Sequence, residues 1–183
     1  MQHPPLAFLL ACARRGVRFS PWLLVCNVHA QRMDLYRRFA AVAGRWPAYR
    51  WLRRFRVSTS RFGTGQVRDT NRTPLGLHRI AEKIGGGWPI GAVFRNRRLT
   101  GFTWQGQPTA PIAHRIFWLE GLEPGFNRGG DVDTFARYIY IHGLADEPTL
   151  GRPASRGCIH LSAADLLPLY DRLPVGTLVW IEP

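Results

Sequence analysis

Short runs of aliphatic, aromatic and β-branched residues recur along this 183-residue chain, separated by turns rich in glycine, proline and polar residues. Runs of this length and composition predict strands, because such side chains suit a pleated, partly buried surface. The first run extends into a hairpin, and the last follows a turn at residues 174–177. The predicted strands cover residues 22–28, 32–37, 56–60, 77–84, 90–94, 112–119, 137–142 and 178–181.

Two segments depart from the strand pattern. Ser162-Ala163-Ala164-Asp165 has the form of a capping box, with Asp in place of Glu, and predicts a helix that ends near Arg172. Pro168 falls inside this helix and is expected to kink it or delay its start. Residues 39–56 are basic and aromatic, and we expect a loop or helix in which arginine stems pack on rings. The pattern therefore predicts a mainly β fold with one or two short helices.

The N-terminal segment, residues 1–20, has an uncertain role, and residues 21–183 are expected to form one domain. The segment contains an apolar run, residues 6–13, that is too short to span a bilayer. Ala11-Cys12-Ala13 resembles a signal cleavage site, but Arg14-Arg15 follow the run, whereas a secretory signal carries its positive charges before it. A cleaved signal and a surface helix that packs on the domain or touches a membrane are both open.

Positive charge is concentrated in the first part of the chain. Thirteen of the 25 basic residues lie in residues 1–68, where Asp34 is the only acidic residue. Such a distribution favours an anionic partner, although Lys83 is the only lysine and heavy arginine use can also reflect genome composition. We expect basic residues 14–68 to face an anionic surface. Aromatic residues interleaved with arginines can bind nucleic acid, but no nucleic acid partner is expected.

The candidate chemistry lies near the end of the predicted strand over 137–142. His142 ends this strand, and Gly157 precedes Cys158 in a small turn. A thiol and a histidine that can remove its proton are the minimum set for covalent acyl transfer. The backbone of Gly157 and Cys158 is the expected oxyanion site. No Asp or Asn is obviously placed to orient His142, so we expect a backbone carbonyl to do so.

Other interpretations of these residues are open. A single cysteine is often a small buried hydrophobic residue, which is what we expect of Cys26 in its apolar strand. His142, Cys158 and His160 are a possible metal-ligand set, but they lack a clear fourth ligand and the usual spacing of zinc sites. With three cysteines in no pattern, the chain does not predict a disulfide framework.

The segment around Cys158 resembles the signature of the L,D-transpeptidase catalytic domain, the YkuD-like family. The family pairs a His-Gly-Thr motif with Ser-x-Gly-Cys-Ile-Arg, followed by an Asp and a Leu-Tyr pair. An upstream turn and the closing strand also fit, so the resemblance covers roughly residues 22–183. The matching positions are His142-Gly143-Leu144, Ser155-Arg156-Gly157-Cys158-Ile159-His160, Asp165, Leu169-Tyr170, Thr73-Pro74-Leu75-Gly76 and residues 175–181.

The resemblance implies a β-sandwich-like L,D-transpeptidase catalytic domain that uses no cofactor and no metal. It implies that Cys158 is the nucleophile and that His142 is the base and then the acid. The substrate would be a peptidoglycan tetrapeptide stem, whose terminal D-Ala leaves as a thioester forms and a second stem completes a 3→3 cross-link. The alternative is an L,D-carboxypeptidase, in which water takes the acyl group. Asp165 also has a simpler interpretation, as the helix cap.

The family pattern also suggests substrate contacts. His160 replaces an arginine, and a neutral imidazole cannot form the two-pronged contact that arginine makes with a carboxylate. Leu144 replaces a threonine, which removes one hydroxyl. The expected substrate-binding residues are Arg137, Tyr140, Gly143, Ser155, Arg156 and His160.

The resemblance favours a monomer in the cell envelope, on the periplasmic side, with residues 14–68 facing an anionic envelope surface. The lack of a clear signal peptide makes a cytoplasmic carboxypeptidase a serious alternative.

Overall fold

The computed structural model describes residues 3–40 and 46–183, and within these ranges it contains two α-helices, one 3-10 helix and ten strands. The helical elements are α1 (Leu6–Arg15), η1 (Gly130–Val132) and α2 (Ala163–Arg172). The strands are β1 (Trp22–Asn27), β2 (Arg32–Ala40), β3 (Ala48–Arg56), β4 (Gly76–Ile84), β5 (Ala92–Arg95), β6 (Arg98–Phe102), β7 (Ala113–Gly121), β8 (Tyr140–Gly143), β9 (Ile159–Leu161) and β10 (Leu178–Glu182).

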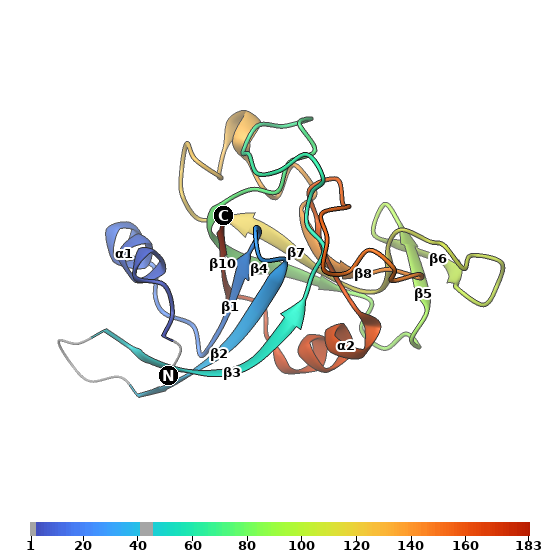
Figure 1. The fold of residues 1–183 in the computed structure, drawn as a ribbon, viewed down its shortest axis with the longest axis horizontal. Helices are drawn as coiled ribbons and strands as arrows, with labels where there is room; N and C mark the ends of the chain where they lie inside the picture. The colour runs from blue at the N-terminus through green and yellow to red at the C-terminus, as the bar shows by residue number, and fades with distance from the viewer. Residues whose placement is uncertain (1–2, 41–45) are drawn as a thin grey trace.

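All ten strands belong to one mixed sheet (Figure 1). Its main path runs β3-β2-β1-β10-β4-β7-β5-β6, and β8 branches from β7 to pair with β9. The pairs β1–β10 and β8–β9 are parallel, whereas the other strand pairs are antiparallel. The mainly β fold with short helices is therefore confirmed.

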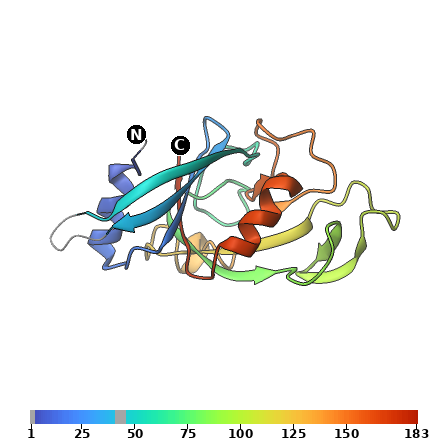
Figure 2. The same ribbon diagram turned by 90° about the horizontal axis from the view of Figure 1, so that it is seen from below.

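The sheet curves, and its main hydrophobic core lies in the concavity. Figure 2 shows β2 and β3 on one side of the molecule, β4 and β7 on the other, and α2 beside them. The core joins Leu24 and Met33 from the first side with Phe117 and Ile141 from the second, and Leu166 of α2 packs among them. Two parts of one sheet thus face each other across a common core, which gives the fold its sandwich-like character.

The helix α1 packs against the outer surface of the sheet. Phe8 is fully buried, and its ring makes edge contacts with Phe19, Tyr49 and Trp180 at centroid distances of 6.0, 6.2 and 6.4 Å. The predicted apolar run is therefore a helix that packs on the domain. In the part of the chain that the structure describes, no helix has the length and apolar character needed to cross a membrane.

Of the predicted capping box, the Ser162 cap forms at the start of α2, but the Asp165 carboxylate bonds to the Ser162 hydroxyl and not to its backbone amide. The Ser162 hydroxyl accepts a hydrogen bond from the Asp165 amide at 3.2 Å and donates one to the Asp165 carboxylate at 2.9 Å. Arg53 of β3 reaches the same carboxylate, 2.6 Å away. Pro168 lies within the helix, which continues to Arg172. These contacts give Asp165 a structural role at the helix N-terminus.

Three predictions about elements need correction. Residues 48–56 are not a loop or helix but form β3, which pairs with β2. The strand forms because Tyr49 and Phe55 are buried while the arginines between them face solvent. Residues 41–45 lie outside the described part of the chain. The predicted strand over 56–60 is reduced to single bridges that Ser58 and Ser60 make with His160 and Ser155. The strand carrying His142 begins at Tyr140, because Tyr138 adopts a left-handed backbone conformation (φ 57°).

The burial of His78 is expected to make stability depend on pH. Its imidazole is fully buried in β4, with Nδ1 3.0 Å from the Gly76 carbonyl oxygen and Nε2 3.1 Å from the Thr134 hydroxyl, and burial lowers its pKa to about 4. Below about pH 6.5 the unfolded chain binds a proton at His78, whereas the folded protein does not bind it until the pH approaches 4. The contribution of His78 to the free energy of unfolding is therefore complete above pH 6.5 and is lost as the pH falls towards 4.

We expect this single group to remove up to about 3 kcal/mol of unfolding free energy between these pH values. Urea unfolding at pH 7.5 and 4.5 measures the loss, which should be smaller in His78→Gln, because glutamine does not titrate. His29→Gln, at an exposed site, should leave the loss unchanged. Equal losses in the parent and in His78→Gln would contradict this assignment.

Candidate active site

Two neighbouring parallel strands bring the candidate residues together. β8 carries Tyr140 and His142, and Cys158 immediately precedes β9. The register places His142 opposite His160 and Ile141 opposite Ile159. Since Ile141 and Ile159 are fully buried in the core, the alternate positions of both strands face the other way, towards the site.

The turn before Cys158 is held by local hydrogen bonds. The Ser155 hydroxyl donates to the Cys158 carbonyl oxygen at 2.6 Å and accepts from the Gly157 amide at 3.2 Å. Gly157 has φ +114°, and a Cβ there would lie 3.1 Å from Ile139 and 3.3 Å from the Arg72 carbonyl oxygen. Glycine is therefore required at this position, and Ser155 fixes the backbone that carries the thiol.

The Cys158 thiol is half-buried and contacts the backbone of β8 and the turn before it. Its Sγ lies 3.4 Å from the Tyr140 amide nitrogen and 3.6 Å from the Tyr138 carbonyl oxygen. Burial raises the pKa of the thiol to about 11, although the Tyr140 N–H and the positive charge of Arg137 act in the opposite direction. The sulfur therefore carries its proton at neutral pH.

The imidazole of His142 is buried and oriented by the backbone. Its Nδ1 lies 2.9 Å from the Gly143 carbonyl oxygen, so Nδ1 carries the hydrogen and Nε2 has the free lone pair. Burial lowers its pKa to about 4. A backbone carbonyl thus occupies the place predicted for an orienting group. Gly143 itself is packed tightly, because a Cβ there would lie 2.8 Å from the Ala113 carbonyl oxygen.

His160 lies against His142, with ring centroids 4.8 Å apart. Its Nδ1 is buried and has no hydrogen-bond partner. Burial, together with the neighbouring His142, lowers its pKa to about 3. The two imidazoles therefore lie side by side in their neutral forms, and the His160 Nδ1 is a buried polar atom without a partner.

A cavity of about 410 Å³ lies beside the Cys158 turn. Arg137 and Arg156 line it, and Arg137 is held by the carbonyl oxygens of Arg72 at 2.7 Å and Gly65 at 3.3 Å. The charged residues in its lining are Arg68, Asp69, Arg137 and Arg156. Three positive groups against one negative group make this cavity suited to a carboxylate.

The structure adds an aromatic wall that sequence reasoning missed. Trp118 of β7 stacks on Phe135 with ring centroids 3.9 Å apart and meets the edge of Tyr140 at 5.6 Å, and Cys158 packs against this cluster. The Arg97 guanidinium lies 4.8 Å from the Trp118 ring centroid. These residues come from segments distant in sequence, and no motif marks them. Only the strand pairing Trp118–Tyr140 reveals the connection.

Metal ligation finds no support in the site geometry. Across residues 3–40 and 46–183, no group of three or more His, Cys, Asp or Glu side chains is arranged to hold a metal ion. This includes the set His142, Cys158 and His160 considered from the sequence. Cys26 is fully buried, as expected of a core residue.

The raised pKa of Cys158 predicts how the free protein reacts with alkylating agents. Because only the thiolate is nucleophilic, the rate of carboxamidomethylation at Cys158 should keep rising with pH to beyond pH 9. Peptide mass spectrometry measures the modified fraction at Cys158 over time. A rate that levels off at or below pH 7 would mean a pre-formed thiolate and would contradict the structure.

The match to a protein family agrees with this fold and site. Residues 21–181 match the model of the YkuD family, the L,D-transpeptidase catalytic domain. The chain therefore belongs to the L,D-transpeptidase catalytic domain family. A search of curated proteins found no match.

Solved structures with a similar fold include three that share 13–16% sequence identity with this chain. Bd1075 of Bdellovibrio bacteriovorus has a TM-score of 0.57 at 14% identity, over 90% of this chain and 48% of its own. The L,D-transpeptidase LdtMt1 in complex with imipenem has a TM-score of 0.51 at 16% identity, over 88% of this chain and 59% of its own. The L,D-transpeptidase of Enterococcus faecium (C442S mutant) has a TM-score of 0.51 at 13% identity, over 90% of this chain and 50% of its own. This chain thus spans about half the length of these proteins.

Proposed function

We propose that this protein is a cysteine acyltransferase acting on peptidoglycan tetrapeptide stems, with Cys158 as nucleophile and His142 as general base. The observation that carries the proposal is the partly accessible thiol of Cys158, held by a rigid turn beside an arginine-lined cavity and one strand away from an oriented imidazole. Family membership supports the class of reaction.

In the first half-reaction, the sulfur of Cys158 attacks the carbonyl carbon of the third stem residue. Nε2 of His142 takes the thiol proton and then donates it to the nitrogen of the departing D-Ala, as the peptide bond breaks and a thioester forms. The Gly157 amide is already bonded to the Ser155 hydroxyl, so we assign the Cys158 amide as the main oxyanion donor.

In the second half-reaction, an amine of another stem attacks the thioester carbonyl and loses its proton to His142, which donates a proton to the sulfur as the C–S bond breaks. The amide that forms is the 3→3 cross-link, and Cys158 returns to its thiol form. Because burial raises the pKa of the Cys158 thiol, the departing sulfur readily accepts this proton.

The other site residues are proposed to position the donor stem. Arg137 and Arg156 offer their guanidinium groups to a carboxylate in the cavity. Tyr140 and His160 are proposed to bound the region around the thiol, whereas Ser155 acts through the backbone of the turn before β9 and Gly143 through that of β8. The site is proposed to work in the cell envelope, where such stems are cross-linked.

Product analysis tests this function directly. Purified protein is incubated with a tetrapeptide muropeptide, and the products are separated and weighed by mass spectrometry. We expect dimers that lack one D-Ala, together with free D-Ala. Tripeptide and free D-Ala without dimers would replace the proposal with an L,D-carboxypeptidase, since water would then be the acceptor. An unchanged substrate, with folded protein confirmed by circular dichroism, would contradict both activities.

A further inference from the structure

The outward face of α1 is apolar along nearly its whole length. Phe8, Ala11 and Cys12 point into the protein, whereas Leu6 is 62% exposed, and the other residues that reach the surface before Arg14 are leucines and alanines. A surface helix of a globular protein normally shows polar residues on that side. This helix therefore presents two apolar faces, and the protein itself covers only one of them.

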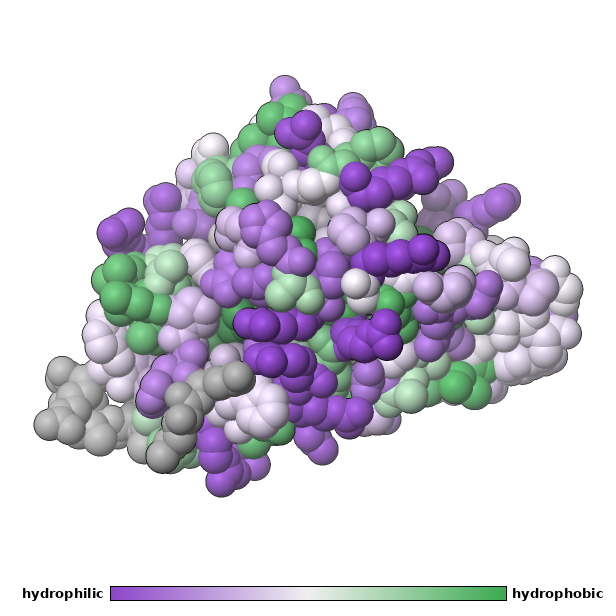
Figure 3. Space-filling model, viewed as in Figure 1, coloured by the Kyte–Doolittle hydropathy of each residue, from purple (hydrophilic) through white to green (hydrophobic). Residues whose placement is uncertain are grey.

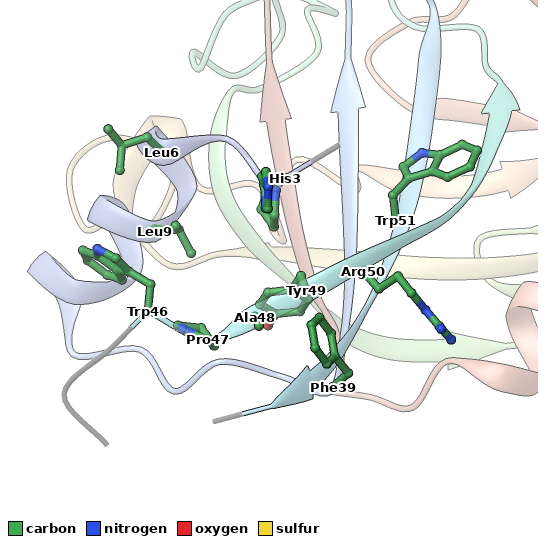
Figure 4. A pocket seen from close by; sticks show the side chains of 11 residues that line it. His3, Leu6, Leu9, Phe39, Trp46, Pro47, Ala48, Tyr49, Arg50 and Trp51 are labelled. Carbon is green, nitrogen blue, oxygen red and sulfur yellow. The ribbon is translucent and has the colours of Figure 1, made fainter. Parts of the chain in front are cut away.

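An apolar hollow adjoins this helix face. It has a volume of about 600 Å³ and lies between α1 and the hairpin of β2 and β3 (Figure 4). Leu6 and Leu9 line it from the helix, and Phe39 and Trp46 from the hairpin. Phe39 is 68% exposed and Trp46 is 47% exposed. Figure 3 shows apolar side chains on the α1 side of the molecule, next to hydrophilic ones.

Arginines surround this apolar face. Arg14 and Arg15 end α1, and with Arg18 they line a second hollow of about 690 Å³. Within the described ranges, none of these three arginines forms an ion pair.

The one acidic residue of this region is already occupied. Asp34 receives hydrogen bonds from the Arg54 guanidinium at 2.8 Å and from the Trp51 indole at 3.0 Å. The remaining positive charge is therefore not neutralised by acidic side chains of residues 1–68. A partner with negative charge at its surface and apolar groups just beneath would satisfy the arginines and the apolar face together.

We propose that α1 and the β2–β3 hairpin dock on an anionic lipid bilayer. An anionic bilayer has this layered chemistry: phosphates at the surface for Arg14, Arg15 and Arg18, and acyl chains below for Leu6 and Phe39. The ten residues of α1 span about 15 Å, so the helix lies in the interface and does not cross it. Nucleic acid would leave the apolar face without a partner.

Docking in this orientation leaves the reaction site free. The strands β8 and β9 lie away from α1 in the fold, at the other side of β4 and β10 (Figure 1). The bound enzyme would therefore present Cys158 away from the lipid. Docking does not rest on the cysteine chemistry, and Cys158→Ala is expected to bind vesicles as the parent does.

Vesicle flotation tests the proposal with the full chain. Vesicles of phosphatidylglycerol and phosphatidylcholine in equal parts should carry the protein upward in the gradient, whereas vesicles of phosphatidylcholine alone should carry little. The variants Arg14→Gln/Arg15→Gln and Leu6→Gln/Phe39→Gln should each bind about tenfold more weakly, the first through charge and the second through lost insertion. Raising the salt concentration should weaken binding of the parent.

Matched controls lie on the β5–β6 hairpin, at the other end of the sheet. Arg95→Gln/Arg98→Gln removes two exposed arginines of this hairpin, and Trp104→Gln removes an exposed aromatic side chain from the turn that follows β6. Both should bind as the parent does. Three results would overturn the proposal: no binding to anionic vesicles, equal loss in the control variants, or a dimer in light scattering that the Leu6→Gln/Phe39→Gln variant abolishes in the absence of vesicle binding.

Discussion

Replacing Cys158 with alanine is expected to abolish turnover of a tetrapeptide stem, with a loss of at least about 10³-fold in kcat, because no other group can form the thioester. The loss should come without unfolding, since the thiol is half-buried and its loss removes only weak contacts with the Tyr140 amide and the Tyr138 carbonyl. Initial rates of D-Ala release measure the effect, and thermal unfolding checks the fold.

The matched control is Cys26→Ala. Cys26 is fully buried in the main core, and burial raises the pKa of its thiol to about 12, so it contributes packing and no nucleophile. We expect this variant to be less stable but to turn over at close to the parent rate. Intact-mass spectra after incubation with imipenem should show an adduct in the parent and none in Cys158→Ala. Near-parent turnover by Cys158→Ala would end the proposed mechanism.

The fold was predictable where local signals and tertiary contacts agree. The strand over residues 77–84 and the helix that Ser162 caps form almost within the predicted bounds, because their apolar spacing and capping residues match their surroundings. The prediction failed for β3, because its many arginines obscure the pattern of buried and exposed residues in the sequence. The segment is recognised as a strand only from its pairing with β2. The strand β6 was missed because its short hairpin depends on left-handed backbone conformations of Asn96 and Arg97, and an Asn-Arg pair does not predict such a turn.

The candidate site was predictable only as far as its motif extends. Gly157 and Ser155 belong to the motif, and the structure explains both through the cramped turn and its hydrogen bonds. Trp118 could not be found, because its place beside Tyr140 follows from the pairing of β7 with β8. The close contact of His142 with His160 likewise needed the parallel register of β8 and β9.

The resting state of the site follows from burial. Burial raises the pKa of the Cys158 thiol and lowers that of the His142 imidazole, so both groups are neutral in the free protein. In the structure the sulfur of Cys158 accepts a hydrogen bond from the Tyr140 amide and makes none with an imidazole. In the proposed mechanism we therefore expect proton transfer to His142 to be coupled to arrival of the substrate, as catalytic hydrogen bonds often tighten only in the complex.

We expect His142→Ala to lower kcat about 10²- to 10⁴-fold, the usual contribution of general acid–base catalysis. The loss should be larger than any effect on KM, because Nε2 acts on protons in the transition state rather than on the bound stem. Steady-state kinetics of D-Ala release separates the two constants, and added imidazole should restore part of the rate by replacing the missing base.

The control for this prediction is His29→Ala, at an exposed turn remote from the site, which should turn over as the parent does. A structural role for His142 is distinguished by stability, since alanine loses the Nδ1 bond to Gly143 and the ring contacts with His160 and Tyr140. If the rate falls only in proportion to the folded fraction and imidazole restores nothing, His142 positions β8 and is not the base. If the restored rate in a folded variant follows the concentration of unprotonated imidazole, a base acts at this site, because filling the cavity alone would not require the unprotonated form.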